Sequence, residues 1–125
     1  MIDIGDVLNI HEFLIHKFGG THGINDQNLL ESAIARPFQT FDKIDLYKSH
    51  FEKAAALLES IVSNHPFIDG NKRTGWVLMR LYLKENGLDI KASQAEKYDF
   101  VISIASNKLS FREVADWIEK HSIST

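Results

Sequence analysis

The chain contains no cysteine and only two prolines, and no hydrophobic run in it is long enough to cross a membrane. Without cysteine the protein has no disulfide, no thiolate nucleophile and no thiolate metal site, so a reducing compartment is tolerated. The first residues, Met1 to Asp6, lack the basic region and the apolar stretch of a signal peptide. We therefore expect a cytoplasmic protein that has no contact with a membrane.

Basic charge is also scarce, because 14 Lys and Arg residues face 17 Asp and Glu residues and the net charge is −3 at pH 7. A large nucleic-acid interface needs clustered Lys and Arg to displace counterions from the phosphates. We therefore expect no direct nucleic-acid partner. A DNA-binding regulator would also need a basic recognition helix, which this sequence lacks.

The length and composition are those of one globular domain. The chain has 125 residues, of which 44% are hydrophobic and 25% are charged. These are ordinary globular values, and no internal repeat or linker divides the sequence. We expect a single domain over residues 1–125, large enough to bury about two thirds of its unfolded surface.

Apolar residues at helical spacing dominate the first half of the chain. The first amphipathic helix is predicted over about residues 7–18 and ends at Gly19-Gly20. The second begins at Asn25 or Asp26 and ends before Pro37. From residue 38 to residue 46 the periodicity fades, and there we expect a short extended flap.

Three later helices begin with a capping box, in which a Ser and the Glu three positions later satisfy each other's backbone N–H groups. These boxes are Ser49–Glu52, Ser93–Glu96 and Ser110–Glu113. The helix after the first box continues to Asn64, because Pro66 prevents further helix. Another helix, from about Asn71 to Asn86-Gly87, is apolar on nearly every side and belongs at the centre. The pattern predicts an all-α, compact bundle of about six helices.

The most informative segment is residues 65–73, with the sequence HPFIDGNKR. It lies between the predicted end of one helix and the start of the next. A helix start presents unpaired N–H groups and the positive end of the helix dipole, both of which favour a phosphate group. Lys72 and Arg73 add cationic donors at the same place. We interpret this segment as a nucleotide site.

The segment resembles the core motif of the Fic family, which reads His, any residue, Phe, any residue, Asp or Glu, Gly, Asn, Lys or Gly, and Arg. The chain is most similar to the Doc branch, the death-on-curing toxins of toxin-antitoxin modules, which have about this length. Further landmarks of that branch are Gly19-Gly20 with Gly23, Leu29 to Ala33 with Arg36-Pro37, and Asn86-Gly87. The resemblance covers most of the chain and implies a Fic-like helical fold.

The resemblance implies a catalytic pair within the motif. His65 would be the general base, since an imidazole titrates near neutral pH and accepts the proton of an attacking hydroxyl. Asp69 would hold Mg²⁺, because this hard cation prefers carboxylate and phosphate oxygens. ATP would be the co-substrate.

The other motif residues would bind phosphate or support the loop. Gly70 and Asn71 would form the anion-binding turn, with Gly allowing close backbone approach and Asn supplying an amide. Arg73 would hold phosphates through its planar fork, and Lys72 would act as a point charge. Phe67 would anchor the loop in the core.

Two positions bear on which group is transferred. Fic enzymes that transfer AMP usually carry a second Arg three residues after the first, where this chain has Trp76. The Doc toxins also lack this Arg, and resemblance to them implies transfer of the γ-phosphate to a threonine of elongation factor Tu, which blocks translation. Gly70 favours the alternative, AMP transfer to a protein hydroxyl (AMPylation), because the prototype Doc sequence has Ala there.

Many Fic enzymes inhibit themselves through a Ser or Thr, three residues, a Glu, and then a Gly or Asn. We find no such segment here, so the resemblance implies a separate antitoxin protein, laid as an amphipathic segment into a groove of the bundle. A catalytically silent helical binding module remains another interpretation, since His65 by itself would more often be structural.

Other residues with chemical potential are assigned no role. His11, His16 and His22 lack the i, i+4 spacing of a helical metal site. Trp76 and Trp117 fall on apolar stripes and are expected in the core.

Overall fold

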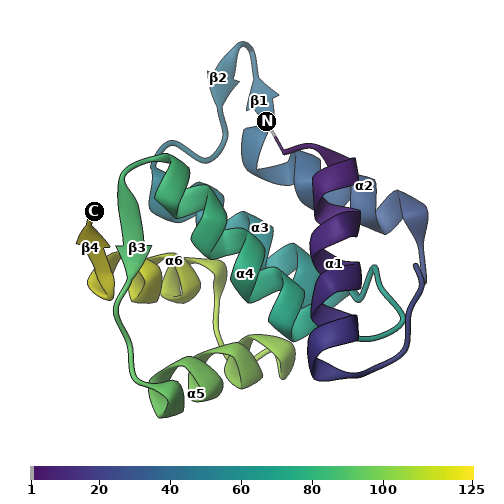
Figure 1. Cartoon of the computed structure of the whole chain (residues 1–125). Coiled ribbons are helices and arrows are strands. Elements are labelled where there is room, and N and C mark those ends of the chain that lie inside the picture. The colour runs from purple at the N-terminus through teal and green to yellow at the C-terminus, as the bar shows by residue number, and fades with distance from the viewer. Residues whose placement is uncertain (1) are drawn as a thin grey trace.

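The computed structural model describes residues 2–125 as six helices with two small two-stranded sheets (Figure 1). The helices are α1 (Ile4–Phe18), α2 (Gln27–Ala35), α3 (His50–Asn64), α4 (Asn71–Glu85), α5 (Gln94–Ala105) and α6 (Phe111–Lys120). The predicted helical bundle is therefore confirmed. None of the helices in this range is long and apolar enough to span a bilayer.

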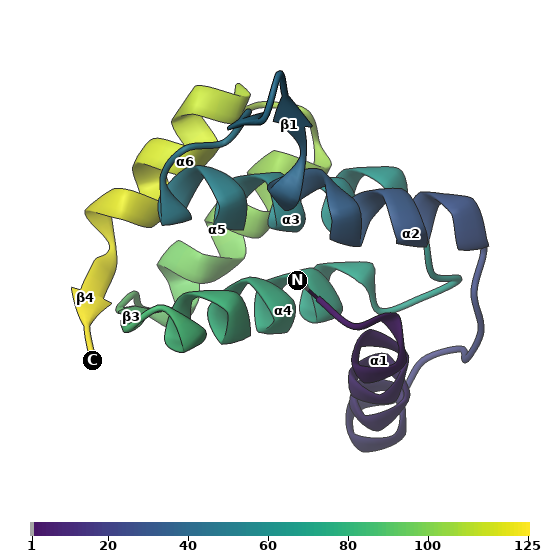
Figure 2. The same ribbon diagram turned by 90° about the horizontal axis from the view of Figure 1, so that it is seen from above.

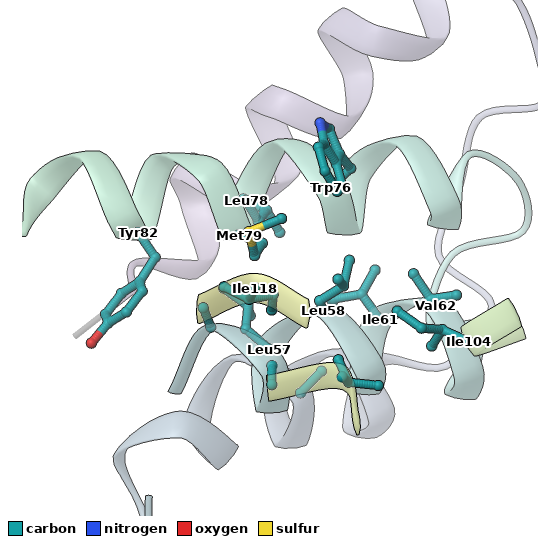
Figure 3. Packing of buried hydrophobic residues seen from close by; sticks show 14 of the residues in the cluster. Leu57, Leu58, Ile61, Val62, Trp76, Leu78, Met79, Tyr82, Ile104 and Ile118 are labelled. Atoms are coloured by element: carbon teal, nitrogen blue, oxygen red, sulfur yellow. The ribbon is translucent and has the colours of Figure 1, made fainter. Parts of the chain in front are cut away.

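The core is built around the contact between α3 and α4, which lie side by side (Figures 1 and 2). Residues of α3, α4, α5 and α6 meet there, as Figure 3 shows; among them are Leu57, Leu58, Ile61, Val62, Met79, Ile104 and Ile118. Burying each of these side chains contributes about 1.5–3 kcal/mol. A Cβ at Gly75 would lie 3.1 Å from Val62 Cγ2, so glycine lets the two helices approach closely. This close contact fixes the ends of α3 and α4, and with them the segment that joins the two helices.

The helix starts follow the predicted caps. Both hydrogen bonds of each capping box are present at α3, α5 and α6. Of the two candidates for the cap of α2, the structure selects Asp26, whose carboxylate accepts the Leu29 N–H at 3.1 Å. The first helix begins at Ile4, earlier than apolar spacing predicts, because Asp3 caps it through the Asp6 N–H.

The predicted flap is a β-hairpin made of β1 (Thr40–Phe41) and β2 (Ile44–Asp45), which projects from the bundle (Figure 1). Asp42 and Lys43 form its turn with φ values of 52° and 66°, the left-handed pair that suits a two-residue hairpin. The extended part is narrower than residues 38–46, because Phe38 lies in the short 3₁₀ helix η1 (Arg36–Phe38).

A second antiparallel pair joins β3 (Leu88–Ile90) to β4 (Ser122–Ser124), which the sequence does not predict. These strands are three residues long, too short to produce a recognisable alternating pattern. Arg80 of α4 donates two hydrogen bonds of 2.9 Å to the Asp89 carboxylate, which attaches β3 to α4. The last residues of the chain are thereby held beside the end of α4.

Candidate active site

Residues 65–70 form the turn between α3 and α4. Helix α3 ends at Asn64, and His65 follows it with left-handed φ and ψ values of 51° and 57°. Pro66 then prevents further helix. The carbonyl of His65 accepts a hydrogen bond of 3.2 Å from the Asn25 side chain. The His65 side chain itself is exposed to solvent, so its imidazole is accessible to a reacting group.

Phe67 is the residue expected to anchor this turn. Its side chain is 1% exposed, and its backbone forms an isolated antiparallel bridge with Ile24. Asn71 Oδ1 accepts the Phe67 N–H at 3.0 Å, and Asn71 Nδ2 donates to the Phe67 carbonyl at 2.9 Å. The Asn71 amide is thus engaged inside the protein, where it closes the loop, and only its backbone N–H remains at the helix start for an anion.

The Asp69 carboxylate is exposed and oriented by two backbone donors. Thr21 N–H donates to Oδ2 at 3.0 Å, and Gly70 N–H donates to Oδ1 at 2.8 Å. These two hydrogen bonds, that of Thr21 first, hold the pKa of the Asp69 carboxyl below its ordinary value. The group is therefore a carboxylate at neutral pH, with oxygen lone pairs left for another ligand.

The start of α4 has the features of a phosphate site. Gly70 stands at the N-cap with a left-handed φ of 78° and provides no side chain to the first N–H groups of the helix. A cavity of about 280 Å³ opens over these groups, and its walls include His65, Asp69, Lys72 and Arg73. The structure therefore brings an imidazole, a carboxylate and two cations together around a helix N-terminus.

A second hollow of about 290 Å³ lies between α4 and α5 and shares Lys72 and Arg73 with the first. Trp76 forms part of its wall but is only 5% exposed, as expected for a core residue, and meets Trp117 edge to face at 6.2 Å. Lys97 Nζ stands 5.3 Å from the centroid of the Trp76 ring. Burial, with a smaller effect of nearby Arg side chains, lowers the pKa of Lys97. The hollow next to Arg73 is thus lined by the Trp76 ring and bordered by positively charged Lys and Arg side chains.

Sequence reasoning missed one residue of the loop's surroundings. His11 of α1 is 2% exposed, and its Nε2 lies 2.8 Å from the carbonyl oxygen of Asp69. Its ring stacks on Phe67 with centroids 3.8 Å apart. The available signal is slight, since His11 simply takes a place on the apolar face of α1. In residues 2–125, no three His, Asp or Glu side chains gather as a metal cluster.

The loop between α1 and α2 completes the surroundings of the motif. Ile68 N–H donates to the Gly23 carbonyl at 3.1 Å, and Asn25 N–H donates to the Pro66 carbonyl at 2.8 Å. Together with the Thr21 contact, these bonds attach residues 21–25 to the motif along its length.

Comparison with known proteins gives one matching family and two similar proteins. The sequence model of the Fic/DOC family matches residues 1–83, from α1 nearly to the end of α4. Toxin Doc of Mycolicibacterium smegmatis is 44% identical over 75 residues, which are 60% of this chain and 58% of that protein. Protein kinase doc of Escherichia phage P1 is 29% identical over 115 residues, which are 92% of this chain and 90% of that protein. The match therefore spans less than two thirds of the first relative and nearly all of the second.

Proposed function

Because this chain belongs to the Fic/DOC family, we propose that it is the toxin of a toxin-antitoxin module and transfers the γ-phosphoryl group of ATP to a hydroxyl of a protein. Relatives named Toxin Doc and Protein kinase doc support both parts of the proposal. The substrate we propose is a translation factor, with a threonine of elongation factor Tu as the first candidate. A separate antitoxin protein would restrain the enzyme, and both would act in the cytoplasm.

His65 is the proposed general base. Its exposed imidazole borders the cavity at the start of α4, so a hydroxyl that enters this cavity meets it. The hydroxyl oxygen forms a bond to the γ-phosphorus, the bond from that phosphorus to the β,γ-bridging oxygen breaks, and ADP leaves. The hydroxyl proton passes to the free nitrogen of His65. Base catalysis of this kind contributes about 10²- to 10⁴-fold to a rate.

The phosphates would be held mainly by backbone groups. The N–H groups of residues 71–73 occupy the first turn of α4, where no side chain caps them. Arg73 adds a planar fork that binds two phosphate oxygens at once, and Lys72 adds a second positive charge. These groups stabilise charge on the transferred phosphoryl group without further rearrangement.

Asp69 fits the Mg²⁺ that the family implies. Mg²⁺ is usually bound by one or two carboxylates together with substrate phosphates and water, and an exposed, ionised carboxylate beside the phosphate cavity meets that need. When bound, the ion would offset the negative charge of the phosphates.

The observation that carries phosphoryl transfer, rather than AMP transfer, is the burial of Trp76. Where AMP-transferring Fic enzymes usually have a second Arg, this side chain is 5% exposed and packs against Trp117. Arg80, one turn further along α4, is engaged by both oxygens of Asp89 and does not replace the missing cation. A bound triphosphate therefore lacks the second Arg contact that would direct its α-phosphorus toward a hydroxyl.

AMP transfer by the same site is a second candidate, and Gly70 is the observation that favours it. The left-handed φ of 78° at this position suits glycine, the residue that AMP-transferring relatives carry. The two candidates differ in which phosphorus of ATP ends on the target.

The test uses ATP labelled at either the α or the γ position, with Mg²⁺ and a bacterial lysate. His65→Asn is the inactive variant, because Asn tolerates the left-handed conformation and lacks the imidazole. His16→Asn, at an exposed position of α1, is the matched control. We expect a γ-labelled band that needs His65 and not His16. Label from α would establish AMP transfer instead. Equal labelling by His65→Asn would reject His65 as the base, and transfer of neither label would favour a binding module.

A further inference from the structure

His11 contacts the motif from another part of the chain. It belongs to α1, is separated from Asp69 by 58 residues, and is 2% exposed. Its Nε2 lies 2.8 Å from the Asp69 carbonyl oxygen. Because a carbonyl only accepts hydrogen bonds, Nε2 carries the proton and donates it. A hydrogen-bonded polar side chain has thus been placed in the core directly beneath the loop.

The carbonyl that His11 binds belongs to the peptide group between Asp69 and Gly70. The N–H of that same peptide group donates to Asp69 Oδ1 at 2.8 Å. One end of the peptide plane is therefore held by His11, while the other end orients the carboxylate. Rotation of this plane would remove a donor from Asp69 and turn the first residues of α4.

Two further contacts leave the loop little freedom. The His11 ring lies almost parallel to the Phe67 ring, with an angle of 6° between them and 3.8 Å between centroids. A Cβ at Gly20 would lie 2.8 Å from Asp69 Oδ2, so the α1–α2 loop approaches the carboxylate as closely as glycine permits. The Thr21 N–H completes this approach with its bond to Oδ2. Helix α1 and the loop after it thus hold Asp69 from both ends.

We infer that His11 is a positioning residue for the transfer reaction: its Nε2–H fixes the Asp69–Gly70 peptide plane and thereby orients the Asp69 carboxylate and the phosphate-binding start of α4. This inference rests on the proposed function for its effect on rate. Its geometric part stands separately, because the orientation of the peptide plane is measurable without catalysis.

A pair of variants separates positioning from simple core filling. His11→Phe keeps an aromatic ring for stacking on Phe67 but has no donor. His11→Gln loses the ring but carries an N–H₂ group that reaches about as far as Nε2. A filling role predicts that Phe replaces His better than Gln in every measurement. A positioning role predicts that Phe is better for stability and Gln is better for activity.

The experiment measures three properties of the full-length protein: the melting temperature, the rate of γ-phosphoryl transfer with saturating Mg²⁺ and ATP, and the NMR shift of the Gly70 amide proton. His16→Phe, at an exposed site on the same helix, is the control. We expect His11→Phe to lower the rate at least tenfold, as small misplacements of reacting groups do. We expect His11→Gln to stay within about threefold of the parent protein, as the loss of less than one ordinary hydrogen bond implies.

After correction for the ring current of the aromatic side chain at position 11, the Gly70 amide resonance should move in His11→Phe and remain near its original position in His11→Gln. An unchanged Gly70 shift in His11→Phe, or rates that follow the melting temperatures of the two variants, would overturn the inference. If His11→Phe does not fold, His11→Asn takes its place, because the shorter amide does not reach the Asp69 carbonyl. If the parent protein transfers no phosphoryl group, the proposed function fails, while the Gly70 shifts still decide whether His11 fixes the peptide plane.

Discussion

The guanidinium carbon of Arg73 lies 4.4 Å from the centroid of the Phe18 ring, so the last turn of α1 contacts a cation of the proposed phosphate site. Phe18 is 54% exposed and Arg73 is exposed as well, so this contact lies at the surface of the protein. A guanidinium that stacks on a ring keeps its edge donors free. The contact therefore orients Arg73 while leaving its fork available to phosphate.

Replacing Phe18 by Leu should weaken ATP binding about threefold, since a cation–π contact at an exposed site contributes about 0.5–1 kcal/mol. Isothermal titration with a non-hydrolysable ATP analogue measures this change. Phe13→Leu is the matched control, because Phe13 is also exposed on α1 and contacts Lys17 instead. Equal affinities for the parent protein and Phe18→Leu would show that the Arg73 contact does not assist binding.

Asn71→Ala should lower the free energy of unfolding by about 2–3 kcal/mol, because two hydrogen bonds to buried backbone groups of Phe67 are lost together. Urea denaturation gives the value. Asn86→Ala offers a calibrated comparison, since that side chain makes one such bond, to the Tyr82 carbonyl, and should cost about 1 kcal/mol. A cost for Asn71→Ala no greater than that for Asn86→Ala would contradict the assignment of Asn71 as the closure of the loop.

Gly70→Ala should destabilise the protein by about 1–2 kcal/mol, since an L-residue must adopt the left-handed conformation. The added Cβ would also lie 2.9 Å from Ile15 Cδ1, the flexible end of a side chain. Ile15→Val removes that methyl group. In a double-mutant cycle measured by urea denaturation, the two substitutions together should therefore cost less than the sum of their separate costs. If the two losses in the free energy of unfolding simply add, the contact between the added Cβ and Ile15 does not destabilise the protein.

The ion pair between Arg80 and Asp89 should make stability depend on pH in the acid range. The Arg80 side chain, followed by a smaller effect of the Ile90 N–H, lowers the pKa of Asp89 to about 2. A lowered pKa means that the stabilisation is complete above the unfolded-state value of 3.8 and is lost as the pH falls through about 2.

Asp89→Asn should therefore cost about 1 kcal/mol at pH 7, a figure that allows for solvent screening of the partly exposed Arg80. At pH 2 the difference from the parent protein should be much smaller. Urea denaturation at several pH values measures it, with Asp116→Asn, in an exposed ion pair on α6, as the control. A cost independent of pH would indicate that the ion pair is not its source.

The helices and the motif loop are readable from the sequence because their signals are local. Gly19 ends α1 by adopting a positive φ, and Pro66 prevents α3 from continuing. Each capping box joins residues only three positions apart. The left-handed turn at Gly70 also follows from the residue type. Signals of this kind act within a few residues and need no knowledge of the folded chain.

Contacts between distant segments are not readable in the same way. Nothing in the sequence near His11 indicates that its ring meets Phe67, or that Arg80 meets Asp89 across the start of β3. The Asn71 amide is an example within the motif itself, since its spacing suits an anion contact while its geometry directs it to the Phe67 backbone. Each of these contacts depends on where the bundle places the helices and on the direction in which each side chain points from its helix.

The order of the amino acids predicts a helical bundle, the boundaries of most helices, and the chemical groups of the motif between α3 and α4. Those features depend on apolar periodicity, caps and breakers, which are short-range. Only the packed fold brings His11 to the loop, Phe18 to Arg73, and Arg80 to Asp89. These contacts arise because burial at the α3–α4 interface sets the positions of the helices, and those positions decide which side chains far apart in the chain lie together.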